Sequence, residues 1–213
     1  MMTSKSYISL ELFILFILLP ISLVFSFPVW IKAGLILMSF IYIIVVMLRI
    51  EKFSFKIKRS LDWNQFWKRI SFTFIGIAII TTLFVYFMDS DKLFCVPINN
   101  PKLWIGILFV YTFLSVWPQE FIYRTFFFSR YESIFKNKKL LIFINAILFC
   151  LAHLFFKNTL VIVLTFIGGL LFGLTYLKTK STLLVSIEHA LYGNWLFTVG
   201  MGQMLAFPGM ESC

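Results

Sequence analysis

Long apolar runs of membrane-spanning length follow one another along this chain of 213 residues, with short polar segments between them. A transmembrane helix needs about 20 mostly apolar residues to cross the hydrocarbon core of a bilayer. The runs predict seven such helices, at residues 10–27, 29–48, 70–88, 102–128, 140–156, 159–177 and 183–202. Because 61% of the residues are hydrophobic and only 13% are charged, the composition excludes an ordinary soluble globular domain. We therefore predict an all-α, polytopic membrane protein.

The basic residues gather in short blocks between alternate runs. The blocks consist of Arg49, Lys52, Lys56, Lys58, Arg59, Lys68 and Arg69, then Arg130, Lys136, Lys138 and Lys139, then Lys178 and Lys180. Basic loops favour the cytoplasmic side of a membrane, so the N-terminus is predicted inside and the C-terminus outside. The net charge of +10 would also suit nucleic acid. Because the blocks flank membrane spans, we expect anionic lipid headgroups as their partners and no nucleic acid.

The chain shows no linker, repeat or low-complexity segment that would divide it. We expect one structural unit made of two parts. Residues 1–101 would hold three transmembrane helices and the first basic loop, and residues 102–213 a core of four transmembrane helices. Gly169 and Gly173 form a small-x-x-x-small pair, which is typical of close contact between membrane helices. We interpret this pair as a packing feature.

Ionisable side chains interrupt the apolar runs of the second part. Glu120 and Arg124 lie one helical turn apart, and His153 and His189 are the only two histidines. A charge at bilayer depth costs roughly 2.5–3.5 kcal/mol or more, so it usually faces a polar cavity and marks a functional site. Counted from the nearest basic block at about 1.5 Å per residue, Glu120 lies about 15 Å deep, His153 about 21 Å and His189 about 14 Å. These three side chains are expected to meet in one cavity.

A simpler structural explanation applies to Glu120 and Arg124 alone. The arginine could extend toward the cytoplasmic interface, with the glutamate as its partner. The two histidines at similar depth favour a functional site over this explanation.

A carboxylate beside two imidazoles can activate water, hold a metal ion or relay protons. For hydrolysis, a glutamate in apolar surroundings can take a proton from water, while neutral imidazoles and an amide orient the water and stabilise the oxyanion. A zinc site needs three protein ligands, and Glu120, His153 and His189 are the only plausible set. Their spacing lacks the His-Glu-x-x-His signature, so the sequence supports zinc only weakly as a candidate cofactor. Two histidines on facing helices could also ligate a haem iron.

Three motifs carry these residues in a fixed order along the chain. They are Gln119-Glu120-x-x-x-Arg124, then Phe149-x-x-x-His153, and then the stretch from His189 through Gly193 to Asn194. Over about residues 102–200 they resemble the CPBP family (CAAX proteases and bacteriocin-processing proteins, also called Abi) of intramembrane endopeptidases. The family pattern is Glu-Glu-x-x-x-Arg, Phe-x-x-x-His and, after a glycine-rich helix, His-x-x-x-Asn/Asp. The chain differs in having Gln119 for the first glutamate and Asn194 five residues after the histidine, where an ideal helix turns it about 100° further round.

The resemblance implies an intramembrane endopeptidase that cleaves a membrane-anchored protein or peptide near its anchor. In the family the first glutamate of the pair is usually taken as the general base, and that position is Gln119 here. We therefore expect Glu120 to take over the role of base, with His153, His189 and Asn194 positioning the water and the oxyanion. Gln119 and Arg124 would belong to the same site. The residues of the three motifs resemble a bacterial branch of the family, which implies that the protein lies in the bacterial plasma (inner) membrane.

A second hypothesis is a catalytically inactive relative that acts as a membrane binding protein or a self-immunity protein. Gln119 is its main support, because a glutamine side chain cannot accept a proton.

Overall fold

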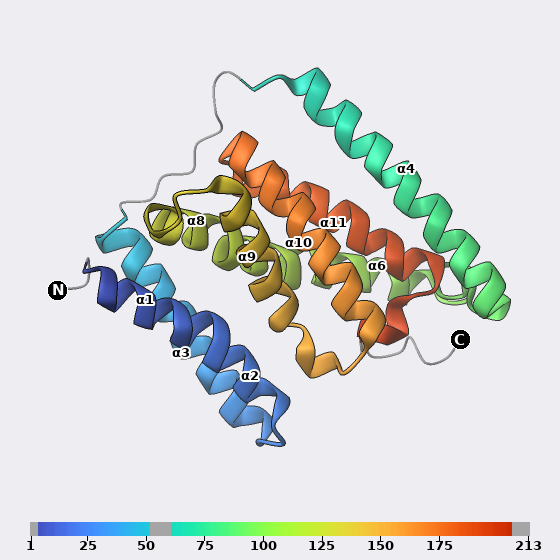
Figure 1. Ribbon diagram of the computed structural model, residues 1–213. Helices are drawn as coiled ribbons and strands as arrows, with labels where there is room; N and C mark the ends of the chain where they lie inside the picture. The colour runs from blue at the N-terminus through green and yellow to red at the C-terminus, as the bar shows by residue number, and fades with distance from the viewer. Residues whose placement is uncertain (1–3, 52–60, 206–213) are drawn as a thin grey trace.

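The computed structural model describes residues 4–51 and 61–205, and these residues form helices connected by short turns, without strands (Figure 1). Residues 52–60 of the predicted first basic loop lie outside the described residues. In the part of the chain that the structure describes, six helical segments are long and apolar enough to cross a membrane. They are Lys5–Val24, Val29–Arg49, Trp63–Met88, Pro101–Ile134, Lys138–Phe156 and Thr159–Thr179. The all-α polytopic membrane fold predicted from the apolar runs is confirmed, and these six segments correspond to the first six runs.

The seventh predicted run corresponds to α11 (Thr182–Val199), which does not belong to this set of six. Glu188, His189 and Asn194 make it more polar than the other helices. More than half of its residues are buried inside the protein. Because other helices cover it, α11 does not need an apolar surface toward lipid. The predicted seven spans therefore become six apolar helices and one more polar, largely enclosed helix, and the orientation of the termini stays a prediction.

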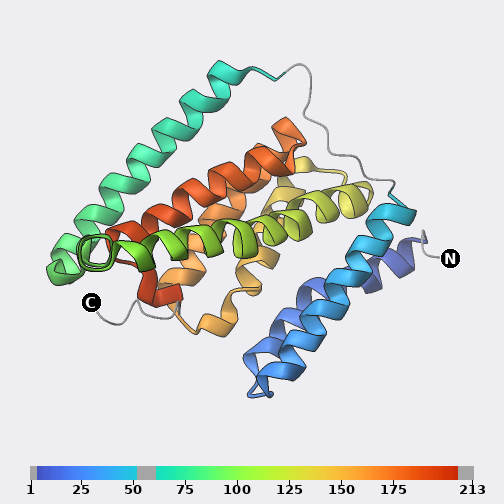
Figure 2. The ribbon, with the colours of Figure 1, turned by 180° about the vertical axis from the view of Figure 1, so that it is seen from behind.

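Helix α11 lies in the middle of the bundle. It contacts α4 (Trp63–Met88), α10 (Thr159–Thr179) and the long helix that begins with α6 (Pro101–Val110). Figure 1 shows α10 and α9 (Lys138–Leu151) on one side of α11, and Figure 2, from behind, shows the long helix on the other. The N-terminal helices α1 (Lys5–Phe13), α2 (Leu19–Val24) and α3 (Val29–Arg49) form a hairpin at one edge, and α4 lies at the opposite edge.

Two prolines coincide with widened turns in the transmembrane helices. The π-helical segment Ile14–Leu18 precedes Pro20, and the π-helical segment Tyr111–Val116 precedes Pro118. A proline lacks the backbone N–H and its ring clashes with the carbonyl four residues earlier, so the helix locally opens to a wider turn. The long helix then continues through α7 (Trp117–Glu120), a second π-helical segment (Phe121–Phe126) and α8 (Phe127–Tyr131). The widened turns set the directions of the side chains around Glu120.

A buried polar cluster attaches the N-terminal hairpin to the rest of the bundle. Glu11, on α1, accepts hydrogen bonds from Arg130 Nε at 2.9 Å and from the Tyr131 hydroxyl at 2.9 Å. The Tyr42 hydroxyl of α3 bonds the same carboxylate. Phe16 packs beside this cluster with its ring centroid 5.7 Å from that of Tyr131. The hairpin is thus held by a satisfied buried charge pair together with aromatic packing.

Gly169 and Gly173 lie where α10 crosses α9. A Cβ atom on Gly169 would lie 2.8 Å from Ala146 Cα, and one on Gly173 would lie 3.2 Å from Ile142 Cγ2. At Gly169 only glycine lets the two backbones approach this closely, whereas at Gly173 the Ile142 side chain would have to shift slightly. The interpretation of the glycine pair as a packing feature is confirmed.

This crossing yields a prediction. Gly169→Ala should lower the free energy of unfolding by about 1–3 kcal/mol, because the added methyl group meets backbone atoms of α9 that cannot move aside cheaply. Denaturant unfolding in detergent micelles would measure the change. Gly106→Ala is the matched control, since a Cβ atom there meets no atom within 4 Å. Equal stability of the two variants would contradict the assignment of the crossing.

Candidate active site

Glu120 and His189 meet in the interior of the bundle, where α7 faces α11. The distance between Glu120 Oε1 and His189 Nδ1 is 2.7 Å. The Glu120 side chain is fully buried, and His189 is 7% exposed. A carboxylate can only accept a hydrogen bond here, so Nδ1–H of His189 donates to it and Nε2 carries the lone pair. His189 can therefore act as a base, because the neighbouring Glu120 carboxylate would stabilise the positive charge of the protonated imidazole.

The second oxygen of Glu120 faces Arg124. Arg124 Nε lies 3.3 Å from Glu120 Oε2, and both side chains are fully buried. Arg124 Nη1 donates to Asn145 Oδ1 at 2.9 Å, and the guanidinium lies 4.6 Å from the centre of the Phe149 ring. An arginine that extended toward the interface would be partly exposed, so the simpler explanation of this pair does not hold. Arg124 instead supplies the counter-charge that keeps a carboxylate inside the bundle.

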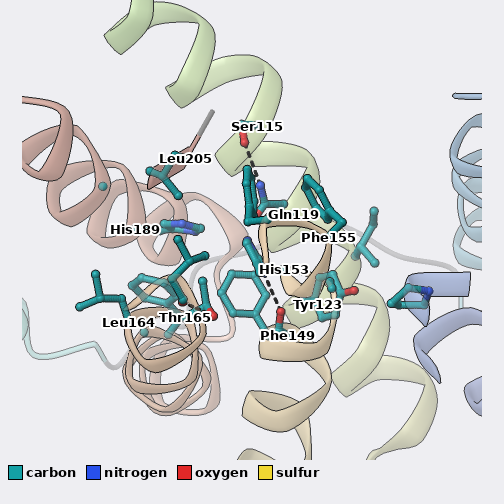
Figure 3. A pocket seen from close by; sticks show the side chains of 18 of the residues that line it. Ser115, Gln119, Tyr123, Phe149, His153, Phe155, Leu164, Thr165, His189 and Leu205 are labelled. Carbon is teal, nitrogen blue, oxygen red and sulfur yellow. Dashed lines mark hydrogen bonds between the residues drawn. The ribbon is translucent and has the colours of Figure 1, made fainter. Parts of the chain in front are cut away.

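A cavity of about 380 Å³ lies between the N-terminal hairpin and the bundle (Figure 3). Its wall is mostly apolar, and its polar lining includes Gln119, His153, His189 and Tyr111. Glu120 does not line the cavity, because it lies behind His189. The imidazole of His189 is therefore the part of the Glu120–His189 pair that reaches the cavity.

His153 lies on the same cavity wall. Its Nδ1 lies 2.7 Å from the Phe149 carbonyl oxygen, an interaction drawn as a dashed line in Figure 3. The carbonyl can only accept, so Nδ1 carries the proton and Nε2 carries the lone pair. The Phe149 ring centroid lies 4.7 Å from that of His153 and 5.8 Å from that of His189. The two histidines thus share one cavity and one aromatic neighbour.

Gln119 presents an unsatisfied acceptor. Its Nε2 donates to Ser115 Oγ at 2.8 Å, as Figure 3 shows. Its Oε1 is buried without a hydrogen-bond partner among the residues that the structure describes. A buried acceptor without a partner is costly, and one beside a cavity is suited to a water molecule or a substrate N–H group.

Asn194 lies apart from the cavity lining. Helix α11 is regular through Gly193, so the fifth position after His189 points to another side. Asn194 Nδ2 donates to Thr112 Oγ1 at 3.0 Å. The distortion that would bring Asn194 toward His189 does not occur in α11, and the widened turn at this level belongs to the facing segment, Tyr111–Val116.

Tyr111 also lies in the site, although the sequence motifs do not include it. Its hydroxyl lies 3.1 Å from His189 Nε2, and its side chain is 8% exposed. A Cβ atom on Gly193 would lie 2.0 Å from the Tyr111 hydroxyl oxygen, so only glycine admits this ring. The feature of the sequence that could have indicated a bulky neighbour here is Gly193, one helical turn after His189.

Glu188, the neighbour of His189, faces the other way. It accepts hydrogen bonds from Arg69 Nη1 at 3.3 Å and from the Tyr192 hydroxyl at 3.1 Å, and from the Thr175 hydroxyl. Glu188 is absent from the cavity lining. It is a buried carboxylate of the same helix with a structural role.

The donor atoms do not fit a zinc site. Among the residues that the structure describes, no three His, Cys, Asp or Glu side chains are grouped so that they could hold a metal ion. Both ring nitrogens of His189 are already hydrogen-bonded, one to Glu120 and one to Tyr111. The same contacts leave His189 without a nitrogen to ligate haem iron.

Comparison with known proteins gives one match. A family model described as Rce1-like, type II CAAX prenyl endopeptidase, matches residues 101–196. The matched segment begins with α6 and ends inside α11, so it contains all six residues predicted for the site. It excludes the N-terminal hairpin and α4. No curated protein and no solved structure matches the chain.

The buried ion pair yields a prediction about stability. Arg124→Met should lower the free energy of unfolding by about 3–5 kcal/mol, because it leaves the Glu120 carboxylate buried without its counter-charge. The double variant Glu120→Gln with Arg124→Met should lose less. Lys178→Met, at an exposed basic residue of α10, is the control and should change the value by less than about 0.5 kcal/mol. If Arg124→Met were as stable as this control, the pair would not be buried as described.

Proposed function

Because the chain belongs, through residues 101–196, to the Rce1-like family of type II CAAX prenyl endopeptidases, a CPBP family, we propose that it is an intramembrane endopeptidase. Its substrate would be a membrane-anchored protein or peptide, cut near the anchor. The observation that carries this proposal is the buried Glu120–His189 pair whose imidazole borders a cavity inside an integral membrane protein. From the motif resemblance we place the protein in the bacterial plasma (inner) membrane.

In this proposal Glu120 and His189 act as one base. A water molecule in the cavity first replaces the Tyr111 hydroxyl as the hydrogen-bond donor to Nε2 of His189, and then gives its proton to Nε2 as its oxygen attacks the peptide carbonyl. The Glu120 carboxylate, 2.7 Å from Nδ1, stabilises the imidazolium that forms. The role predicted for Glu120 from sequence is thus carried through His189, because Glu120 itself does not reach the cavity.

His153 and Gln119 would orient the reactants. The Nε2 lone pair of His153 can accept a hydrogen bond from the attacking water, since its Nδ1 is already committed to the Phe149 carbonyl. The unsatisfied Oε1 of Gln119 can accept a hydrogen bond from a backbone N–H group of the substrate. Groups held in place by their own hydrogen bonds position reactants without a further entropic cost.

The cavity wall suits a substrate with an apolar anchor. Most of its lining is apolar, and the hairpin provides one side of it through the π-helical segment Ile14–Leu18, α2 and α3. An apolar chain could lie along this side while the scissile peptide bond lies beside His189. Ligand sites of this kind combine a large apolar surface with a few polar groups that fix orientation.

A binding protein without catalytic activity is the second candidate. Gln119 favours it, because the amide cannot take up a proton. The intact Glu120–His189 pair favours the enzyme, because a groove that only binds peptide has no use for a buried base.

The first experiment tests the base pair. Purified protein reconstituted in vesicles is mixed with a prenylated peptide ending in Cys-aliphatic-aliphatic-X, and with peptides anchored by a single apolar helix. Glu120→Gln should lower the cleavage rate by about 10²–10⁴, because the imidazolium loses its stabilising charge. Thermal unfolding of the same preparation shows whether the variant is folded.

Glu188→Gln is the matched control, since it neutralises a buried carboxylate of the same bundle outside the cavity. It should cleave at close to the original rate when folded. Undiminished cleavage by folded Glu120→Gln protein would refute the base pair. Folded original protein that cleaves none of the anchored peptides would overturn the endopeptidase proposal in favour of the binding protein.

Gln119→Glu offers a second prediction. A carboxylate at this position of the cavity wall adds a proton acceptor beside His189, so cleavage should be retained or increased. The rate over a pH series would measure it. Loss of all cleavage by the folded variant would show that the reaction needs the amide of Gln119 itself.

A further inference from the structure

We propose that Tyr111 is a further catalytic residue of this site, whose hydroxyl donates a hydrogen bond to the oxyanion formed during peptide cleavage. This inference rests on the proposed endopeptidase function. It adds a donor that neither the motifs nor the predicted site residues include.

The position of Tyr111 is the first argument. Its hydroxyl lies 3.1 Å from His189 Nε2, and both residues line the cavity. Because Nδ1–H of His189 donates to Glu120, Nε2 accepts the proton of the Tyr111 hydroxyl. Glu120, His189 and Tyr111 therefore form one hydrogen-bonded chain that runs from the buried carboxylate to the cavity.

The packing of Tyr111 is the second argument. Its ring lies edge-on to Phe197, with centroids 4.8 Å apart, at the start of the π-helical segment Tyr111–Val116. Gly193 makes room for the ring, because a Cβ atom there would lie 2.0 Å from the hydroxyl oxygen and 2.4 Å from ring carbons. The hydroxyl thus occupies the space beside His189 that a side chain at position 193, one turn along α11, would otherwise fill. A donor held this rigidly is suited to stabilising a developing charge.

When a peptide and a water molecule enter the cavity, the Tyr111 hydroxyl turns from His189 Nε2 to the carbonyl oxygen of the peptide, and the water takes its place as the donor to Nε2. The water oxygen bonds to the carbonyl carbon, the π electron pair of the C=O bond moves to the carbonyl oxygen, and the water proton passes to His189 Nε2. Protonated Nε2 cannot accept from Tyr111 again, so the hydroxyl continues to donate to the new oxyanion. The C–N bond then breaks, its electron pair takes the proton from Nε2, and a carboxylic acid and an amine leave.

A structural cap is the competing explanation. If Tyr111 only satisfied the Nε2 lone pair, its hydroxyl would block the base, and removing it would leave cleavage unchanged or faster. The two explanations predict opposite effects of Tyr111→Phe, which keeps the ring and its packing.

The experiment compares the original protein, Tyr111→Phe and Glu120→Gln on the prenylated peptide in vesicles. Tyr111→Phe should lower kcat by about 10²–10³, as loss of one oxyanion donor does, with KM nearly unchanged. Tyr131→Phe is the control, because it removes a buried hydroxyl bonded to Glu11 outside the cavity, and it should keep the original kcat. Thermal unfolding shows that each variant is folded.

A second measurement separates a catalytic group from one that only positions His189. A phosphinate analogue of the peptide carries a tetrahedral oxyanion, and its affinity follows transition-state binding. Tyr111→Phe should weaken this analogue by about the factor lost in kcat. A loss of kcat with unchanged analogue affinity would overturn the oxyanion role.

The remaining outcomes are also decisive. Original kcat in Tyr111→Phe with loss of cleavage in Glu120→Gln would overturn the Tyr111 proposal and leave the endopeptidase standing. Absence of cleavage by the original protein would instead overturn the endopeptidase, and the role of Tyr111 with it.

Discussion

The site depends on how one carboxylate is stabilised in the absence of water. Glu120 is fully buried, and its two oxygens face His189 Nδ1 at 2.7 Å and Arg124 Nε at 3.3 Å. Desolvating a charge inside a membrane protein is costly unless protein groups replace the water. Arg124 is in turn held by Asn145, whose amide donates to the Tyr123 carbonyl. The ion pair with Arg124 and the hydrogen bonds of His189 and Asn145 that retain the carboxylate therefore also fix α7, α9 and α11 relative to one another.

Backbone irregularity places the side chains around this carboxylate. The long helix from Pro101 contains two π-helical segments, one on each side of α7. Such turns often occur at functional sites, because they change the direction of a side chain without ending the helix. Tyr111 begins the first segment and Arg124 lies in the second. Pro118 explains the first segment directly, since it removes a backbone donor from the middle of the helix.

Hydropathy and the depth of polar residues in the membrane were enough to predict much of this structure. The remaining features depend on local geometry that the sequence does not show. The apolar runs predicted the six spanning helices because lipid requires a continuous apolar surface. Matching depth predicted that Glu120 and His189 would meet. Depth gives no rotation about the helix axis, so it could not show that Glu120 lies behind His189. Tyr111 could not be recognised from the sequence, because its partner His189 lies 78 residues later in the chain. In addition, 20% of the residues are aromatic, so a single tyrosine does not stand out.

Burial and charge pairing alone do not identify the site, because the described residues contain three buried carboxylates of this kind. Glu11 pairs with Arg130 and attaches α1 to α8, and Glu188 pairs with Arg69 and attaches α11 to α4. These two pairs join the hairpin and α4, which lie outside residues 101–196, to the matched segment. Only Glu120 combines its arginine with a histidine that borders the cavity. A buried ion pair stabilises an attachment, whereas a buried pair that extends through an imidazole to a cavity can also transfer a proton.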